Sequence, residues 1–66
     1  MSFSENLKQI RKENHLSQEE LAELLDVSRQ AVSKWENGAS DPSTSNLIAL
    51  AKLFKISPEE LLQDIE

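Results

Sequence analysis

Hydrophobic residues recur at helical spacing along most of this chain. In the first stretch, residues 3–13, Phe3, Leu7 and Ile10 fall at i, i+4 and i+7, which places them on one face of a helix. No stretch alternates apolar and polar residues in the way that a half-buried strand does. The pattern therefore predicts an all-α fold.

Serine-based capping signals open the second and third helices. Ser17, followed three residues later by Glu20, predicts a capping box at the start of the second helix. Ser28 is the expected N-cap of a third helix over residues 29–36. Because only about three residues join these two helices, we expect them to cross at a steep angle.

A glycine turn and one further cap complete the set of elements. Asn37 and Gly38 should end the third helix, since both residue types tolerate positive φ. A fourth helix is predicted over residues 44–54. The fifth begins at "SPEE", with Ser57 as N-cap and Pro58 at the first helical position. The sequence thus predicts five helices.

Length and cysteine content limit how such a fold is stabilised. We expect 66 residues to form a single domain, 1–66, which buries roughly 60% of the surface that the unfolded chain exposes. With no cysteine, neither disulfides nor thiolate metal sites are available, so packed helices must supply the stability. The sequence has neither a membrane-length apolar run nor a basic segment before a hydrophobic one, which favours a cytoplasmic protein without a membrane partner.

The net charge of −5 at first argues against a polyanionic partner. However, residues 57–66 contain four acidic residues, Glu59, Glu60, Asp64 and Glu66, and no Lys or Arg. Residues 1–56 therefore carry a net charge of only −1. Most of the excess negative charge is therefore confined to the C-terminal segment.

The stretch "VSRQAVSKWENG", residues 27–38, has two faces. At 100° per residue, Ala31, Val32 and Trp35 cluster on one side of a helix. We therefore expect Trp35 to have a structural role, with part of the indole at the surface. The other side carries hydrogen-bonding residues, namely Arg29, Gln30, Ser33, Lys34 and Asn37. One face packs, and the other is presented to a partner.

The segment "QEELAELLDVSRQAVSKWENG" resembles the helix-turn-helix of the phage-repressor family (Cro and cI type, XRE-like), and the resemblance extends from about Leu7 to Leu62. Ala22 stands at the small position of that family. The resemblance implies a compact five-helix bundle, a lambda-repressor-like DNA-binding domain, whose third helix enters the major groove. Arg can pair there with guanine and Gln with adenine. The DNA-binding residues that it implies are Gln18, Ser28, Arg29, Gln30, Ser33, Lys34 and Asn37.

Two positions depart from the family pattern. Asp26 stands where glycine usually adopts a left-handed conformation, which Asp enters at modest cost. The loop after the third helix is frequently basic in the family, whereas this chain has Ala39, Ser40 and Asp41. We therefore expect weak affinity for the DNA backbone.

Each polar residue of the expected interface also has a simpler interpretation. Arg29 and Lys34 could be ordinary solvated cations, and Gln18 and Ser33 could simply be exposed. Asn37 could serve only to end its helix.

The resemblance further implies a structural ion pair between Arg11 and Glu36, as related phage repressors have.

The leading hypothesis is a transcriptional regulator, a repressor that binds a near-palindromic operator in double-stranded DNA as a homodimer. The expected dimer interface is the apolar stripe of the last helix, Leu61, Leu62 and Ile65, with Leu61 also in the core. A protein-interaction module of the same fold, such as an antitoxin-like partner binder, is the alternative, favoured by the acidic tail and the loop. No nucleophile with a base, phosphate-binding glycine loop or metal spacing indicates an enzyme, a cofactor or a small-molecule substrate.

Overall fold

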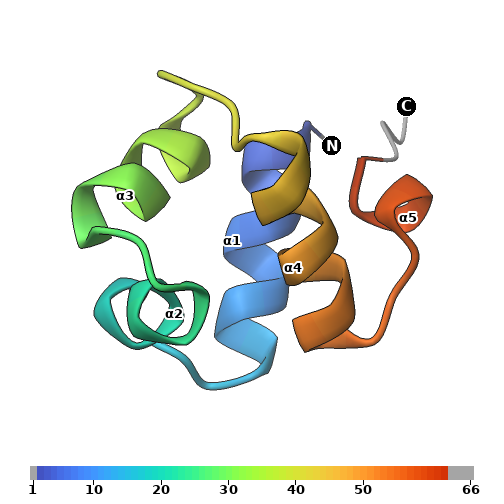
Figure 1. The fold of residues 1–66 in the computed structure, drawn as a ribbon, viewed down its shortest axis with the longest axis horizontal. Coiled ribbons are helices and arrows are strands. Elements are labelled where there is room, and N and C mark those ends of the chain that lie inside the picture. Colours follow the sequence, from blue (N-terminus) through green and yellow to red (C-terminus); the bar gives the residue numbers. More distant parts are fainter. Residues whose placement is uncertain (1, 63–66) are drawn as a thin grey trace.

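The computed structural model describes residues 2–62, which form five helices and, within that range, no strand (Figure 1). The helices are α1 (Phe3–Glu13), α2 (Gln18–Leu25), α3 (Arg29–Asn37), α4 (Thr44–Phe54) and α5 (Pro58–Leu62). All five predicted helices are present, and the predicted all-α class is confirmed. The third helix extends one residue beyond its predicted end, so that Asn37 is its last residue.

Short-range hydrogen bonds determine where the helices begin. The Ser17 hydroxyl oxygen accepts a hydrogen bond from the Glu20 backbone N–H at 3.0 Å, and the Glu20 carboxylate accepts one from the Ser17 N–H at 2.9 Å. Because the hydrogen bonds from the Ser17 backbone N–H and side chain stabilise the charged carboxylate, the pKa of the exposed Glu20 carboxyl lies below its usual value. Ser28 caps α3 by accepting from the Ala31 N–H at 3.1 Å. The predicted caps are confirmed.

Two left-handed residues set the turns on either side of α3. Asp26 ends α2 with φ 58°, and Gly38 ends α3 with φ 80°. Asp26 thus adopts the conformation expected at this position, although it is not glycine. Figure 1 shows α2 almost along its axis, beside α3 seen from its side. Ala22, 3% exposed, provides the small buried side chain that this close packing requires.

The centre of the core receives one fully buried residue from every helix. These residues are Leu7, Leu21, Val32, Leu50 and Leu61, and none has any exposed surface. Burial of an aliphatic side chain contributes about 1.5–3 kcal/mol, so each helix is anchored by its own contribution. Trp35 joins the same cluster and is 4% exposed, which confirms its structural role but leaves less indole at the surface than expected.

A buried ion pair joins α1 to α3. Arg11 Nε lies 2.6 Å from Glu36 Oε2, and Arg11 Nη2 donates to Glu36 Oε1 at 3.0 Å. The third nitrogen, Nη1, donates to the Leu16 carbonyl oxygen at 2.7 Å in the α1–α2 turn. The ion pair implied by the family resemblance is therefore present, and it fixes α3 against the first helix.

No helix among residues 2–62 is long and apolar enough to cross a membrane. The proposed dimer surface lies at the C-terminal end of the chain. Leu62, the last described residue, is 50% exposed. Ile65, which the sequence placed at a dimer interface, lies outside the described residues.

Candidate nucleic-acid interface

Helix α3 presents the predicted polar face to solvent. Val32, Trp35 and Glu36 are buried on its inner side. The residues on the outer side are Arg29, Gln30, Lys34 and Asn37, all exposed, and Ser33, which is half-buried. The structure thus gathers these five predicted DNA-binding side chains on one helix and leaves most of their donors and acceptors free of the core.

The N-terminal end of α3 combines a cap with two long polar side chains. The Ser28 hydroxyl oxygen accepts from the Ala31 N–H, and its hydroxyl hydrogen remains able to donate. Arg29 and Gln30 follow in the first turn, where the helix dipole adds positive potential. This end of α3 is therefore suited to approach an anionic groove.

Asn37 has a structural task at the other end of the helix. Its side-chain oxygen accepts from the Ala39 N–H at 2.9 Å, while the Ala39 N–H also donates to the Lys34 carbonyl oxygen at 2.9 Å. Asn37 and Gly38 therefore end the helix as expected, although only Gly38 adopts a positive φ and Asn37 acts through its side chain. Because the oxygen is used in the turn, the amide nitrogen is the group of Asn37 that can contact a partner.

Gln18 lies at the first position of α2 and is half-buried. Its Nε2 donates to Glu36 Oε1 at 3.1 Å, so the side chain is attached to the buried ion pair. Sequence reasoning placed Gln18 at the interface but missed this contact. The two residues are 18 positions apart, and no local spacing signals such a bond.

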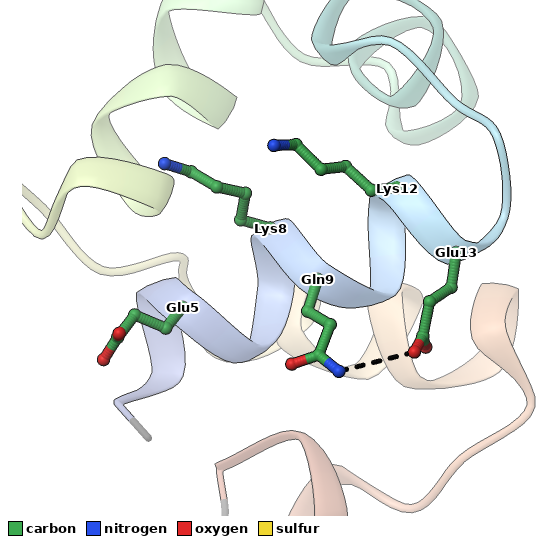
Figure 2. Close-up of a pocket in the computed structure, with 5 residues that line it drawn as sticks. All are labelled: Glu5, Lys8, Gln9, Lys12 and Glu13. Carbon is green, nitrogen blue, oxygen red and sulfur yellow. Dashed lines mark hydrogen bonds between the residues drawn. The ribbon is translucent and has the colours of Figure 1, made fainter.

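Two lysines on α1 add positive charge that the sequence reasoning also missed. Lys8 and Lys12 point toward the side of α1 that faces α2 and α3, as Figure 2 shows. Gln9 and Glu13, joined by a 3.4 Å hydrogen bond, point the other way. The four residues line a shallow surface hollow together with Glu5 on the same helix. The i, i+4 spacing of the lysines was the available signal.

The loop after α3 contrasts with this positive side. Ala39, Ser40 and Asp41 are all exposed, and they contribute a negative rather than a positive charge. Among residues 2–62, no group of three His, Cys, Asp or Glu side chains is placed to hold a metal ion. The candidate interface is polar, and it centres on α3 and the start of α2.

A sequence model of the helix-turn-helix family matches residues 7–61. The chain belongs to the helix-turn-helix family. The fold is also similar: the structure superimposes with a TM-score of 0.90 on the crystal structure of the P22 c2 repressor protein in complex with a synthetic operator. The identity is 33%, and the match covers 96% of each chain. The predicted phage-repressor-type fold is confirmed.

Curated helix-turn-helix relatives are considerably longer. The chain is 46% identical over its whole length to the HTH-type transcriptional activator BcrR of Enterococcus faecalis, of which it covers 32%. It is 37% identical, over 94% of its length, to the HTH-type transcriptional regulator DicA of Escherichia coli (strain K12), of which it covers 46%. The chain therefore spans less than half of each of these two proteins.

Proposed function

We propose that this helix-turn-helix chain is the sequence-specific DNA-binding part of a transcriptional regulator and that α3 reads base pairs in the major groove. The observation that carries the proposal is the exposed polar face of α3, on a fold that matches an operator-bound repressor. An α-helix fits the major groove, where each base pair presents a distinct pattern of donors and acceptors.

The residues of the interface divide into two classes. Arg29 and Gln30, in the first turn of α3, are proposed to contact base edges, with Arg29 donating two hydrogen bonds to one guanine. Gln18 is proposed to contact phosphate, because the first N–H groups of α2 and its dipole favour an anion there. The remaining proposed contacts, to bases or phosphate, are Ser28, Ser33, Lys34 and Asn37.

Selection of bound duplexes from a randomised DNA pool tests the proposal directly. Arg29→Ala should weaken binding to the selected duplex by about 1–3 kcal/mol and relax the preference at one base pair. Lys52→Ala is the matched control, since it removes one exposed positive charge from α4 and should leave the selected sequence unchanged. An Arg29→Ala protein with unaltered affinity and preference would contradict the assignment of α3.

We further propose that the regulator is a cytoplasmic repressor that binds a near-palindromic operator as a homodimer. Two copies would double the base pairs read and place two recognition helices about 34 Å apart. The proposed contact surface is the end of α5, where Leu62 is 50% exposed, whereas Leu61 is fully buried in the core. Ile65 completes the apolar stripe in sequence.

Leu62→Asp should weaken self-association and operator binding together while the monomer stays folded. The matched control is Leu24→Asp on α2, because Leu24 is similarly exposed, at 58%, but lies on another helix. Sedimentation equilibrium gives the dimer dissociation constant of each protein. Equal constants for Leu62→Asp and the unaltered chain would exclude this surface.

A protein-binding module of the same fold is the second candidate function. The net charge of −5 and the loop with Ala39, Ser40 and Asp41 favour it, because neither attracts a polyanion. The two candidates differ in the outcome of the selection experiment. A regulator enriches one family of duplexes, whereas a protein-binding module enriches none.

A further inference from the structure

The Glu36 carboxylate is the centre of a hydrogen-bond network that reaches the proposed DNA surface. It accepts from Arg11 Nε at 2.6 Å, from Arg11 Nη2 at 3.0 Å and from Gln18 Nε2 at 3.1 Å. The Glu36 side chain is 2% exposed, and that of Arg11 is 11% exposed. Gln18 is the member of the network that stands at the start of α2, at the protein surface.

We propose that Arg11 and Glu36 are positioning residues for DNA-backbone binding, because they hold the amide of Gln18 in the orientation that contacts phosphate. The inference rests on the proposed function, in which Gln18 is a phosphate contact. One amide N–H of Gln18 is directed at Glu36, which fixes the rotation of the whole group. The second N–H is then presented in a defined direction, beside the first N–H groups of α2.

Arg11 makes the arrangement compatible with an approaching phosphate. A carboxylate 3.1 Å from the Gln18 nitrogen would repel a phosphate if its charge were unpaired. Arg11 donates to both oxygens of the Glu36 carboxylate, and this two-point, charge-assisted contact neutralises the negative charge of Glu36. Gln18 can therefore use Glu36 as an anchor without bringing a net negative charge to the DNA.

The same carboxylate also links the two kinds of DNA contact. Glu36 belongs to α3, the proposed recognition helix, whereas Gln18 belongs to α2. The hydrogen bond between them fixes the proposed phosphate contact relative to the helix that reads bases. Orientation of this kind lowers the entropy that must be lost when the complex forms.

A double-mutant cycle on DNA affinity tests the inference. Its four proteins are the unaltered chain, Gln18→Ala, the apolar replacement Arg11→Met/Glu36→Leu, and the combination of all three changes. We expect Gln18→Ala to weaken binding about tenfold on selected and unrelated duplexes alike, as for loss of one charged hydrogen bond. The apolar replacement should cause a similar uniform loss, and adding Gln18→Ala to it should cause no further loss. If Gln18→Ala costs the same factor in both backgrounds, the positioning role is overturned.

Two further measurements separate positioning from a general effect on the fold. Glu36→Gln keeps a side-chain oxygen for Gln18, so Gln18→Ala should retain its tenfold cost in that background; loss of this cost would contradict the proposal. In the unaltered protein, ¹⁵N relaxation should show the side-chain amide of Gln18 to be more ordered on the ps–ns timescale than that of the exposed Gln30. Equal mobility of the two amides would overturn the proposal without any variant.

Failure of this inference is distinguishable from failure of the proposed function. If the unaltered chain enriches no duplex from the randomised pool, the proposed DNA-binding function is overturned, and the inference with it. If a duplex is enriched but Gln18→Ala binds every sequence as the unaltered chain does, the phosphate contact of Gln18 and the positioning role are overturned, while the DNA-binding function of the chain stands.

Discussion

Arg11→Ala is expected to destabilise the domain severely because it leaves the buried negative charge of Glu36 without its partner. Glu36 is 2% exposed at its side chain and would lose two of its three hydrogen-bond donors. Removing one partner of a buried ion pair costs about 3–5 kcal/mol. At about 0.05–0.15 kcal/mol per residue, the total stability of a domain of 66 residues is about 3–10 kcal/mol. The change therefore removes a large part of the stability and can leave the domain largely unfolded.

Equilibrium urea denaturation measures this loss, and Trp35 provides the signal. It is the single tryptophan of the chain and is 4% exposed, so its fluorescence reports unfolding directly. The proteins to compare are the unaltered chain, Arg11→Ala, Glu36→Ala and the double variant. The double variant should lose about 0.5–3 kcal/mol less than the sum of the single losses, because no unpaired charge stays buried in it.

The apolar replacement is the informative control for this cycle. Arg11→Met/Glu36→Leu removes both charges and refills the space, which is often neutral for a buried pair. It should therefore unfold at a urea concentration close to that of the unaltered chain. Strict additivity of the two alanine variants, within about 0.3–0.5 kcal/mol, would refute the reasoning, because it would mean that the two side chains do not interact.

Two more predictions concern the loop and the helix caps. Asp41→Lys should strengthen binding to all duplexes and steepen the dependence of log K on log salt by about 0.9 per added phosphate contact; an unchanged slope would show that the loop does not approach DNA. Hydrogen bonds from Ser2 and Ser17 hold the pKa values of Glu5 and Glu20 below the usual value. Their stabilising effect is present above about pH 4.5, the ordinary pKa of a Glu carboxyl, and is lost as the pH falls through the lower pKa values of the folded chain. Glu5→Gln/Glu20→Gln should flatten this loss in acid denaturation, and an equally steep loss would contradict the assignment.

The helices could be predicted from the sequence because their start signals are short-range. Ser17 and Glu20 are three residues apart, and the hydrogen bonds that they exchange are complete within one helical turn. The turn at Asp26 and the end at Gly38 likewise depend on the local choice of φ. Such features do not require knowledge of what packs against them.

The contacts of the candidate site were harder to predict because they join distant segments. The periodicity of α3 indicates which face is exposed, and the structure agrees for Arg29 and Lys34. The bond from Gln18 to Glu36 instead depends on how α2 and α3 meet in space, and periodicity within one helix carries no such information. The same holds for Lys8 and Lys12, whose direction matters only relative to α3.

The distribution of charge in the fold reconciles an acidic chain with a DNA-binding proposal. Figure 1 places α5, with Glu59 and Glu60, at the opposite end of the molecule from α3, and the longest dimension is 30 Å. Interactions between exposed charges are largely screened beyond about 8 Å at physiological ionic strength. The potential that a phosphate meets at α3 is therefore set mainly by nearby groups such as Arg29 and Lys34. A net charge counted over the whole sequence is a poor guide to a partner when charges of opposite sign lie at opposite ends of the molecule.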